Sequence, residues 1–135
     1  MKYTTDQLLK IIDSNRSNWT SCANRFPVLR SSEKKGKANL FSIDEIYRNA
    51  IFKGLVSRGM HRPQANDIVK SIKKISREDY YVARTGDKIT DYGELIWAGS
   101  INSAMREKCD DIIIINMAKI IDDVDEKVRR YYGNN

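Results

Sequence analysis

Residues 5–27 read TDQLLKIIDSNRSNWTSCANRFP, and this stretch decides the fold of the first half of the chain. The Leu and Ile stripe of residues 5–12 predicts a short amphipathic helix, and the polar residues 13–15 interrupt it. Apolar residues then recur with helical spacing at Trp19, Cys22, Ala23 and Phe26. That spacing predicts a second helix over residues 16–26, which Pro27 ends. Two short helices joined by a tight turn make a candidate helix-turn-helix.

A basic hairpin is predicted directly after this helix pair. Residues 28–30 and 38–41 are expected to be strands, and the turn between them contains Gly36, which can adopt a positive φ. Three lysines lie near the tip of this hairpin: Lys34, Lys35 and Lys37. We interpret the basic hairpin, residues 33–38, as a wing.

A capping box predicts where the next helix begins. Ser42 and Glu45 have the spacing at which the serine accepts from the third helical amide while the glutamate reaches back, and Gly59 ends the helix. A fourth helix is predicted over residues 62–75, with Pro63 in its first turn. The remaining predicted elements are strands at residues 80–85, 94–98 and 111–115, and a last helix at residues 117–132 capped by Asn116.

These elements predict an α+β fold in two parts. Residues 1–77 would form a winged helix-turn-helix with two further helices, and residues 78–135 a small antiparallel sheet with a C-terminal amphipathic helix. The first part contains 9 Lys and 7 Arg against 6 acidic residues, and the second contains 8 basic against 12 acidic residues. This asymmetry is typical of a protein in which one part binds a polyanion and the other part has a different role. Alternatively, the basic residues could simply lie on solvent-exposed helix surfaces.

Composition excludes several classes of protein. The longest apolar run, residues 112–115, is too short for a membrane span, and the N-terminus has no signal peptide, so we expect a cytoplasmic protein. Two cysteines, Cys22 and Cys109, and one histidine, His61, are too few for a Cys/His zinc site. We therefore expect no metal, no cofactor and two free thiols.

The sequence contains few residue patterns that are typical of a catalytic site. The acidic run of the last helix lacks the spacing of a calcium loop and is expected to be a solvated helix surface. Cys22 could be a nucleophile with His61 as its base, but Cys22 falls on the apolar face of the second helix. The glycines form no phosphate-binding loop. We expect that the protein is not an enzyme.

The order of helix, tight turn, helix, basic hairpin and capped helix carries a resemblance. Residues 3 to about 72 resemble the winged-helix DNA-binding domain of the MerR-type transcription regulators. The resembling stretches are YTTDQLLKII (3–12), SNRSNWTSCANRF (14–26), EKKGKANLFS (33–42) and IDEIYRNAIFKGLVSRGM (43–60). The usual basic and aromatic cluster of the second helix is replaced by Thr20-Ser21-Cys22, and no long dimerisation helix follows at once. The chain is more similar to the small MerR-like regulators of phages and mobile elements than to metal sensors.

The resemblance implies which residues meet DNA. The helix of residues 15–26 would enter the major groove, and the wing would lie along the backbone or in the minor groove. The residues implied to face DNA are Arg16, Ser17, Asn18, Thr20, Ser21, Asn24 and Arg25 on the helix and Lys34, Lys35 and Lys37 on the wing. Trp19 and Phe26 would belong to the core.

The leading hypothesis is a homodimeric, sequence-specific double-stranded DNA-binding protein that regulates transcription. The alternative is a protein-interaction or assembly module of a mobile element that keeps a winged-helix scaffold without specific DNA readout. Helical spacing in the last helix predicts a dimer seam of Ile120, Ile121, Val124, Val128 and Tyr131. The same face could instead cover only the sheet of its own chain. The sequence leaves open the operator, the direction of regulation and any small-molecule effector.

Overall fold

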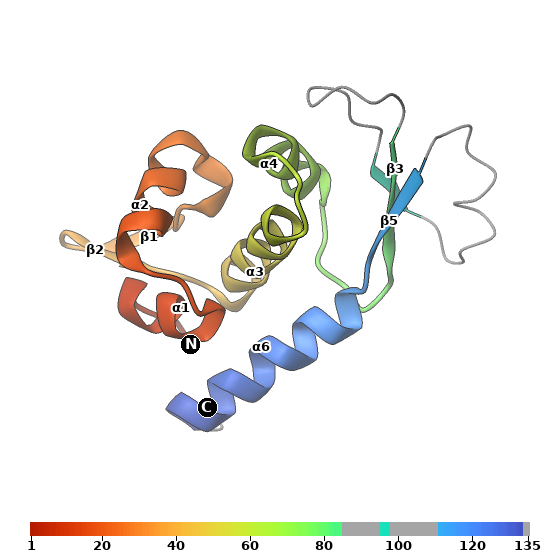
Figure 1. Cartoon of the computed structure of the whole chain (residues 1–135). Coiled ribbons are helices and arrows are strands. Elements are labelled where there is room, and N and C mark those ends of the chain that lie inside the picture. Colours follow the sequence, from red (N-terminus) through yellow and green to blue (C-terminus); the bar gives the residue numbers. More distant parts are fainter. Residues whose placement is uncertain (85–94, 98–110, 134–135) are drawn as a thin grey trace.

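The computed structural model describes residues 1–84, 95–97 and 111–133, which form an α+β structure (Figure 1). The helices of this part are α1 (Thr5–Ile12), α2 (Arg16–Arg25), the 3-10 turn η1 (Pro27–Leu29), α3 (Ile43–Ser57), α4 (Arg62–Ser71) and α6 (Met117–Tyr132). The strands are β1 (Glu33–Lys35), β2 (Ala38–Leu40), β3 (Tyr80–Arg84), β4 (Leu95–Trp97) and β5 (Asp111–Ile115). In Figure 1, α3 and α4 lie between the α1–α2 pair and the sheet that contains β3 and β5. None of the helices in the described ranges is long and apolar enough to cross a membrane.

The first two predicted helices are confirmed, and local capping explains their bounds. Thr4 and Gln7 form a capping box: the Gln7 amide donates to Thr4 Oγ1 at 3.2 Å, and the Thr4 amide donates to Gln7 Oε1 at 2.8 Å. Asp13 ends α1 with a left-handed φ of 53°, a conformation that Asp tolerates. Asn15 then caps α2 by accepting a hydrogen bond from the Asn18 amide at 2.8 Å.

The predicted strand at residues 28–30 is wrong. Pro27 instead begins the single turn η1, in which the Arg30 amide donates to the Pro27 carbonyl at 3.0 Å. Leu29 is only 1% exposed and belongs to the apolar cluster that also contains residues of α3. Burial of Leu29 against α3 thus sets the backbone here, so the segment cannot extend into the hairpin.

The predicted antiparallel hairpin is confirmed a few residues further along. β1 pairs with β2 from Glu33 opposite Leu40 to Lys35 opposite Ala38. Gly36 takes a φ of 65° in the two-residue turn, which is the conformation that tight hairpin turns require and that glycine adopts without steric cost. The hairpin projects from the edge of the molecule on the side of α1 and α2 (Figure 1).

The capping box predicted for α3 is present. The Glu45 amide donates to Ser42 Oγ at 3.2 Å, and the Ser42 amide donates to Glu45 Oε1 at 2.9 Å. Directly before it, Phe41 and Tyr3 exchange two backbone hydrogen bonds of 2.7 and 2.8 Å. This bridge ties the start of the chain to the end of the hairpin, because each residue both donates to and accepts from the other.

Helix α4 begins as predicted, with Pro63 in its first turn, but ends at Ser71 rather than at residue 75. Arg48 of α3 explains the early end. Its Nη1 donates to the carbonyls of Val69 and Ile72 at 3.2 and 2.7 Å, which satisfies carbonyl groups at the C-terminus of the helix.

The predicted strands of the second part are confirmed within the described residues. β3 is the central strand and pairs antiparallel with both neighbours, in the order β4-β3-β5. Tyr80 lies opposite Trp97 on one side and opposite Ile115 on the other. The predicted strand ends Thr85, Glu94 and Ala98 lie outside the described residues.

The predicted dimer seam on α6 is corrected by its packing. Ile121, Val124 and Val128 are buried within the chain, in the cluster formed by α1 and α3. Ile120 is half-buried and packs on the neighbouring cluster, and Tyr131 is exposed. The alternative of a helix that covers only its own sheet is wrong as well, because α6 packs chiefly on α3 and α1. The apolar face of α6 completes the core, so it is not available to a second copy.

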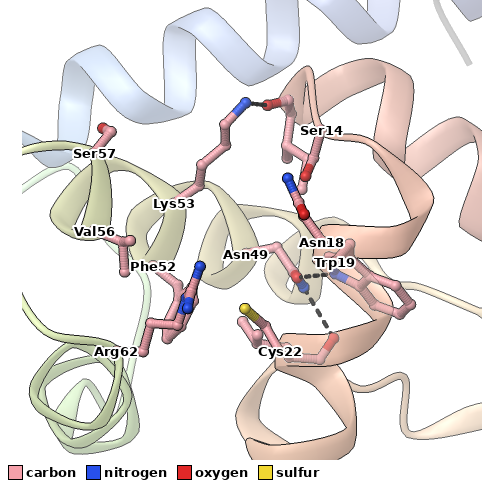
Figure 2. Close-up of a pocket in the computed structure, with 12 residues that line it drawn as sticks. Ser14, Asn18, Trp19, Cys22, Asn49, Phe52, Lys53, Val56, Ser57 and Arg62 are labelled. Atoms are coloured by element: carbon pink, nitrogen blue, oxygen red, sulfur yellow. Dashed lines mark hydrogen bonds between the residues drawn. The ribbon is translucent and has the colours of Figure 1, made fainter.

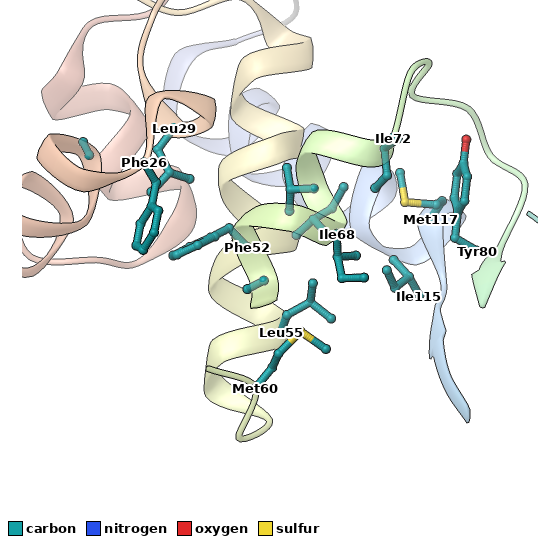
Figure 3. Close-up of a cluster of buried hydrophobic side chains, with 14 residues drawn as sticks. Phe26, Leu29, Phe52, Leu55, Met60, Ile68, Ile72, Tyr80, Ile115 and Met117 are labelled. Carbon is teal, nitrogen blue, oxygen red and sulfur yellow. The ribbon is translucent and has the colours of Figure 1, made fainter. Parts of the chain in front are cut away.

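Both apolar clusters join residues from the two sides of the predicted boundary at residue 77. The first surrounds α3 and α4 and extends to Tyr80, Ile115 and Met117, as Figure 3 shows. The second brings Leu8 and Ile46 against the buried face of α6. Residues 1–77 and 78–135 therefore do not have separate cores.

Candidate nucleic-acid interface

The polar side chains that the resemblance assigns to DNA are open to solvent on α2. All seven are exposed: Arg16, Ser17, Asn18, Thr20, Ser21, Asn24 and Arg25. The opposite face of α2 turns into the molecule, where Ala23 is buried and Trp19 and Cys22 are half-buried. Phe26, just after the helix, is also buried, so the division into core and surface residues follows the predicted helical wheel.

A buried amide fixes α2 on α3. Asn49 is 2% exposed, and its Oδ1 accepts a hydrogen bond from Trp19 Nε1 at 2.8 Å (Figure 2). Its Nδ2 donates to the carbonyls of Leu29 and Glu45 at 3.2 and 2.9 Å. The Trp19 ring also packs edge-on against Phe41, with ring centroids 5.8 Å apart. These contacts hold the inner face of α2, so its outer face has one defined orientation.

An arginine closes the other end of α2. Arg30 Nε donates to the carbonyl of Ala23 at 2.6 Å, and Arg30 Nη2 donates to the carbonyl of Asn24 at 2.7 Å. A cation at a helix C-terminus satisfies free carbonyls and interacts favourably with the helix dipole. The strand predicted at residues 28–30 gave Arg30 no such role, although a cation soon after the end of a helix is a signal for it.

The base of the hairpin is tied to α3 through the same glutamate that caps this helix. Glu45 Oε2 accepts from the Ser32 amide at 2.7 Å while its Oε1 accepts from the Ser42 amide. Ser31 Oγ lies 3.2 Å from Asn39 Oδ1, across the hairpin. Glu45 therefore links the position of the hairpin to the start of α3.

The three hairpin lysines are exposed and point to no carboxylate in the part of the chain that the structure describes. Lys34 and Lys35 lie on β1, and Lys37 lies in the turn. The carboxylate of the same strand, Glu33, pairs instead with Lys2 at 3.2 Å. The hairpin consequently carries three cations that are available to an anionic partner.

The two arginines of α2 have contacts of their own. Arg16 pairs with Asp6 of α1, and both side chains are well exposed. An exposed pair of this kind is worth little in stability, so the guanidinium can exchange its partner. Arg25 lies over the ring of Phe26, 5.0 Å from its centroid.

Part of the positive charge of residues 1–77 has a structural role that net charge alone did not reveal. Lys53 Nζ donates to the carbonyl of Ile12 at 2.6 Å and to that of Asp13, at the end of α1. Arg77 Nη2 donates to Asp122 Oδ1 at 2.7 Å, and this hydrogen bond holds the pKa of Asp122 below its ordinary value. Together with Arg30 and Arg48, these cations stabilise the fold. The net charge therefore overstates the number of cations that are available to bind a polyanion.

The acidic residues of α6 are engaged in ion pairs and one half-buried hydrogen bond. Besides Asp122, Asp123 pairs with Lys119 at 2.9 Å and Glu126 with Arg130 at 2.8 Å. Asp125 accepts from the Tyr47 hydroxyl at 2.6 Å, and burial together with this contact raises the pKa of Tyr47. Within the described ranges, no three His, Cys, Asp or Glu side chains come together in a way that could hold a metal ion. Cys109 lies outside the described residues.

Comparison with known proteins adds no family. No protein-family model matches the chain, and no curated protein matches it.

Proposed function

We propose that this chain is a sequence-specific double-stranded DNA-binding protein, with an N-terminal winged helix-turn-helix, that regulates transcription in the MerR-like manner. The observation that carries the proposal is the two-sided character of α2. Its inner face is anchored through Trp19 and its C-terminal end through Arg30, while its outer face offers amides, hydroxyls and guanidinium groups to solvent. The major groove admits a helix, and these groups match the edges of base pairs there.

The roles follow from the chemistry of each side chain. Asn18 and Asn24 can read adenine with two hydrogen bonds, and Arg25 can read guanine or bind phosphate. Ser and Thr hydroxyls donate to or accept from several bases. The cations of β1 and of the hairpin turn suit phosphate oxygens, whose contacts position the protein without reading sequence.

In this proposal the protein acts in the cytoplasm. It forms a homodimer, because regulators of this kind read paired half-sites. The buried face of α6 does not supply the dimer contact. Among the described residues, the large apolar side chains left exposed besides Met1 are Ile114 and Tyr131. The dimer of this proposal would therefore use a surface other than the predicted seam. The proposal assigns no catalytic activity to the chain.

Changes on the outer face of α2 should alter sequence preference and keep the fold. We expect Asn24→Ala and Ser21→Ala to lose about 1–3 kcal/mol of discrimination at the base pair that each side chain contacts. Both residues are exposed, so the free energy of unfolding should stay within about 0.5 kcal/mol of that of the unchanged protein.

Selection of preferred sites from a random DNA pool measures the effect, with Ser71→Ala, an exposed serine of α4, as the control. Preferred sites identical to those of the unchanged protein in both variants would contradict the placement of α2. If neither the unchanged protein nor any variant selects a preferred DNA site, the result would favour the alternative of an assembly module.

Changes in the hairpin should weaken binding to all DNA sequences alike. Replacing Lys34, Lys35 and Lys37 by Gln should lower the slope of log K against log salt concentration by about 0.9 for each phosphate that the protein no longer neutralises. Gel-shift titrations at several salt concentrations measure this slope. The matched control removes the same charge near the end of α4, in Lys70→Gln with Lys73→Gln and Lys74→Gln, and should leave most of the slope. Equal reductions of the slope in the two triple variants would argue against a local role of the hairpin.

A further inference from the structure

A pocket of about 220 Å³ lies between α2, α3 and the start of α4, and Asn18 of the outer face of α2 is among the residues that line it (Figure 2). Its apolar wall is formed by Trp19 and Cys22 from α2 and by Phe52 and Val56 from α3. Two cations, Lys53 and Arg62, lie at its polar rim. No Asp or Glu belongs to its lining, so the electrostatic character of the pocket is positive.

Two polar side chains of the lining, Trp19 and Asn49, already have hydrogen-bond partners. The Trp19 indole N–H donates to Asn49, and both Asn49 amide hydrogens have backbone acceptors. No buried side-chain nitrogen or oxygen in the described residues lacks a hydrogen-bond partner. The part of the lining formed by Trp19, Asn49 and Phe52 thus suits an apolar group, since Trp19 and Asn49 offer it no unsatisfied donor or acceptor.

The rim, in contrast, offers a cation. Lys53 Nζ already binds the carbonyl groups at the end of α1. Arg62 is exposed, has no ion-pair partner among the described residues, and lines the pocket from the start of α4 (Figure 2). A guanidinium in this position can form two parallel hydrogen bonds with a carboxylate.

We propose that this pocket binds a small aromatic carboxylate. The ring would lie against Trp19 and Phe52, and the carboxylate would face Arg62. The size fits such a ligand, because an apolar cavity of about 150 Å³ holds benzene and the remaining volume accommodates a carboxylate. Aromatic rings pack well on Trp and Phe, and the anion matches the charge of the rim. The site goes beyond DNA binding, and its test needs no DNA, so its failure is distinguishable from failure of the proposed function.

The Trp19 indole N–H signal in a ¹⁵N-correlated NMR spectrum reports on the pocket, and it is identified as the signal absent from Trp19→Phe. We expect benzoate to shift this signal saturably at up to about 10 mM. Benzyl alcohol, which keeps the ring and lacks the charge, should bind at least about fivefold more weakly. Arg62→Gln should weaken benzoate binding about fivefold and leave benzyl alcohol binding unchanged. The matched control Arg58→Gln loses the same charge outside the pocket and should bind benzoate like the unchanged protein.

Three results would each overturn the proposal. The first is the absence of a saturable shift with benzoate. The second is equal affinity for benzoate and benzyl alcohol, which would remove the carboxylate from the recognition. The third is equal weakening by Arg62→Gln and Arg58→Gln, which would mean that only net charge matters.

Discussion

Val124→Glu should unfold the protein. Val124 is 4% exposed at the middle of α6 and packs in the cluster that includes Leu8 and Ile46. The change removes the burial of a valine, worth about 1.5–3 kcal/mol, and places a carboxylate in an apolar cluster, where its desolvation costs further free energy. The combined loss, more than about 4 kcal/mol, approaches the whole stability of a small domain. Circular dichroism during urea titration measures it.

Tyr131→Glu is the matched control, because it places the same charge on the same helix at an exposed position. We expect it to unfold cooperatively with a free energy within about 1 kcal/mol of the unchanged protein, since it removes only surface contacts such as the Lys10–Tyr131 cation–π pair. A Val124→Glu protein that stays folded and sediments as a monomer, while the unchanged protein sediments as a dimer, would restore the seam on α6.

Asn49→Leu should cost about 3 kcal/mol of unfolding free energy, although it makes the core more apolar. The leucine leaves the Trp19 indole N–H and the Leu29 carbonyl without their partner, and each unsatisfied buried group costs about 1–3 kcal/mol. Because the same amide holds α2 on α3, the indole NMR signal of Trp19 should also broaden or move. Urea denaturation gives the free energy.

A double-mutant cycle with Trp19→Phe separates the hydrogen bond from simple packing. Phenylalanine keeps an aromatic ring and removes the donor, so on the Asn49→Leu background it should cost about 1–2 kcal/mol less than on the unchanged protein. Additive effects of the two substitutions would mean that the hydrogen bond of 2.8 Å between the two side chains contributes nothing to how α2 is held.

Local signals predicted the helix starts well. The predicted capping box at Ser42 and the predicted cap at Asn116 are both present, because each depends on residues within one helical turn. The strand at residues 28–30 failed for the opposite reason. A short run of apolar residues is compatible with both a strand and a buried turn. Here the contact of Leu29 with α3 determines which of the two forms.

Tertiary partners explain what else the sequence could not reveal. The stripe on α6 shows that the helix has an apolar neighbour, but a second copy, a sheet and the α1–α3 pair would all produce the same pattern. Asn49 stands on the apolar side of α3, and a polar residue there was a signal that it pairs with a buried donor. Nothing in the spacing identified Trp19 as that donor, since the two residues lie on different helices.

The contribution of α6 to the core has a consequence for synthesis of the chain on the ribosome. Leu8, Ile46 and Tyr47 emerge early, whereas Val128, which packs in the same cluster, is added roughly 80 residues after Tyr47. At usual rates of translation that interval lasts about 4–16 s, during which the early apolar residues lack their cover. The nascent chain therefore exposes apolar residues that chaperones can bind until residue 128 has joined the core.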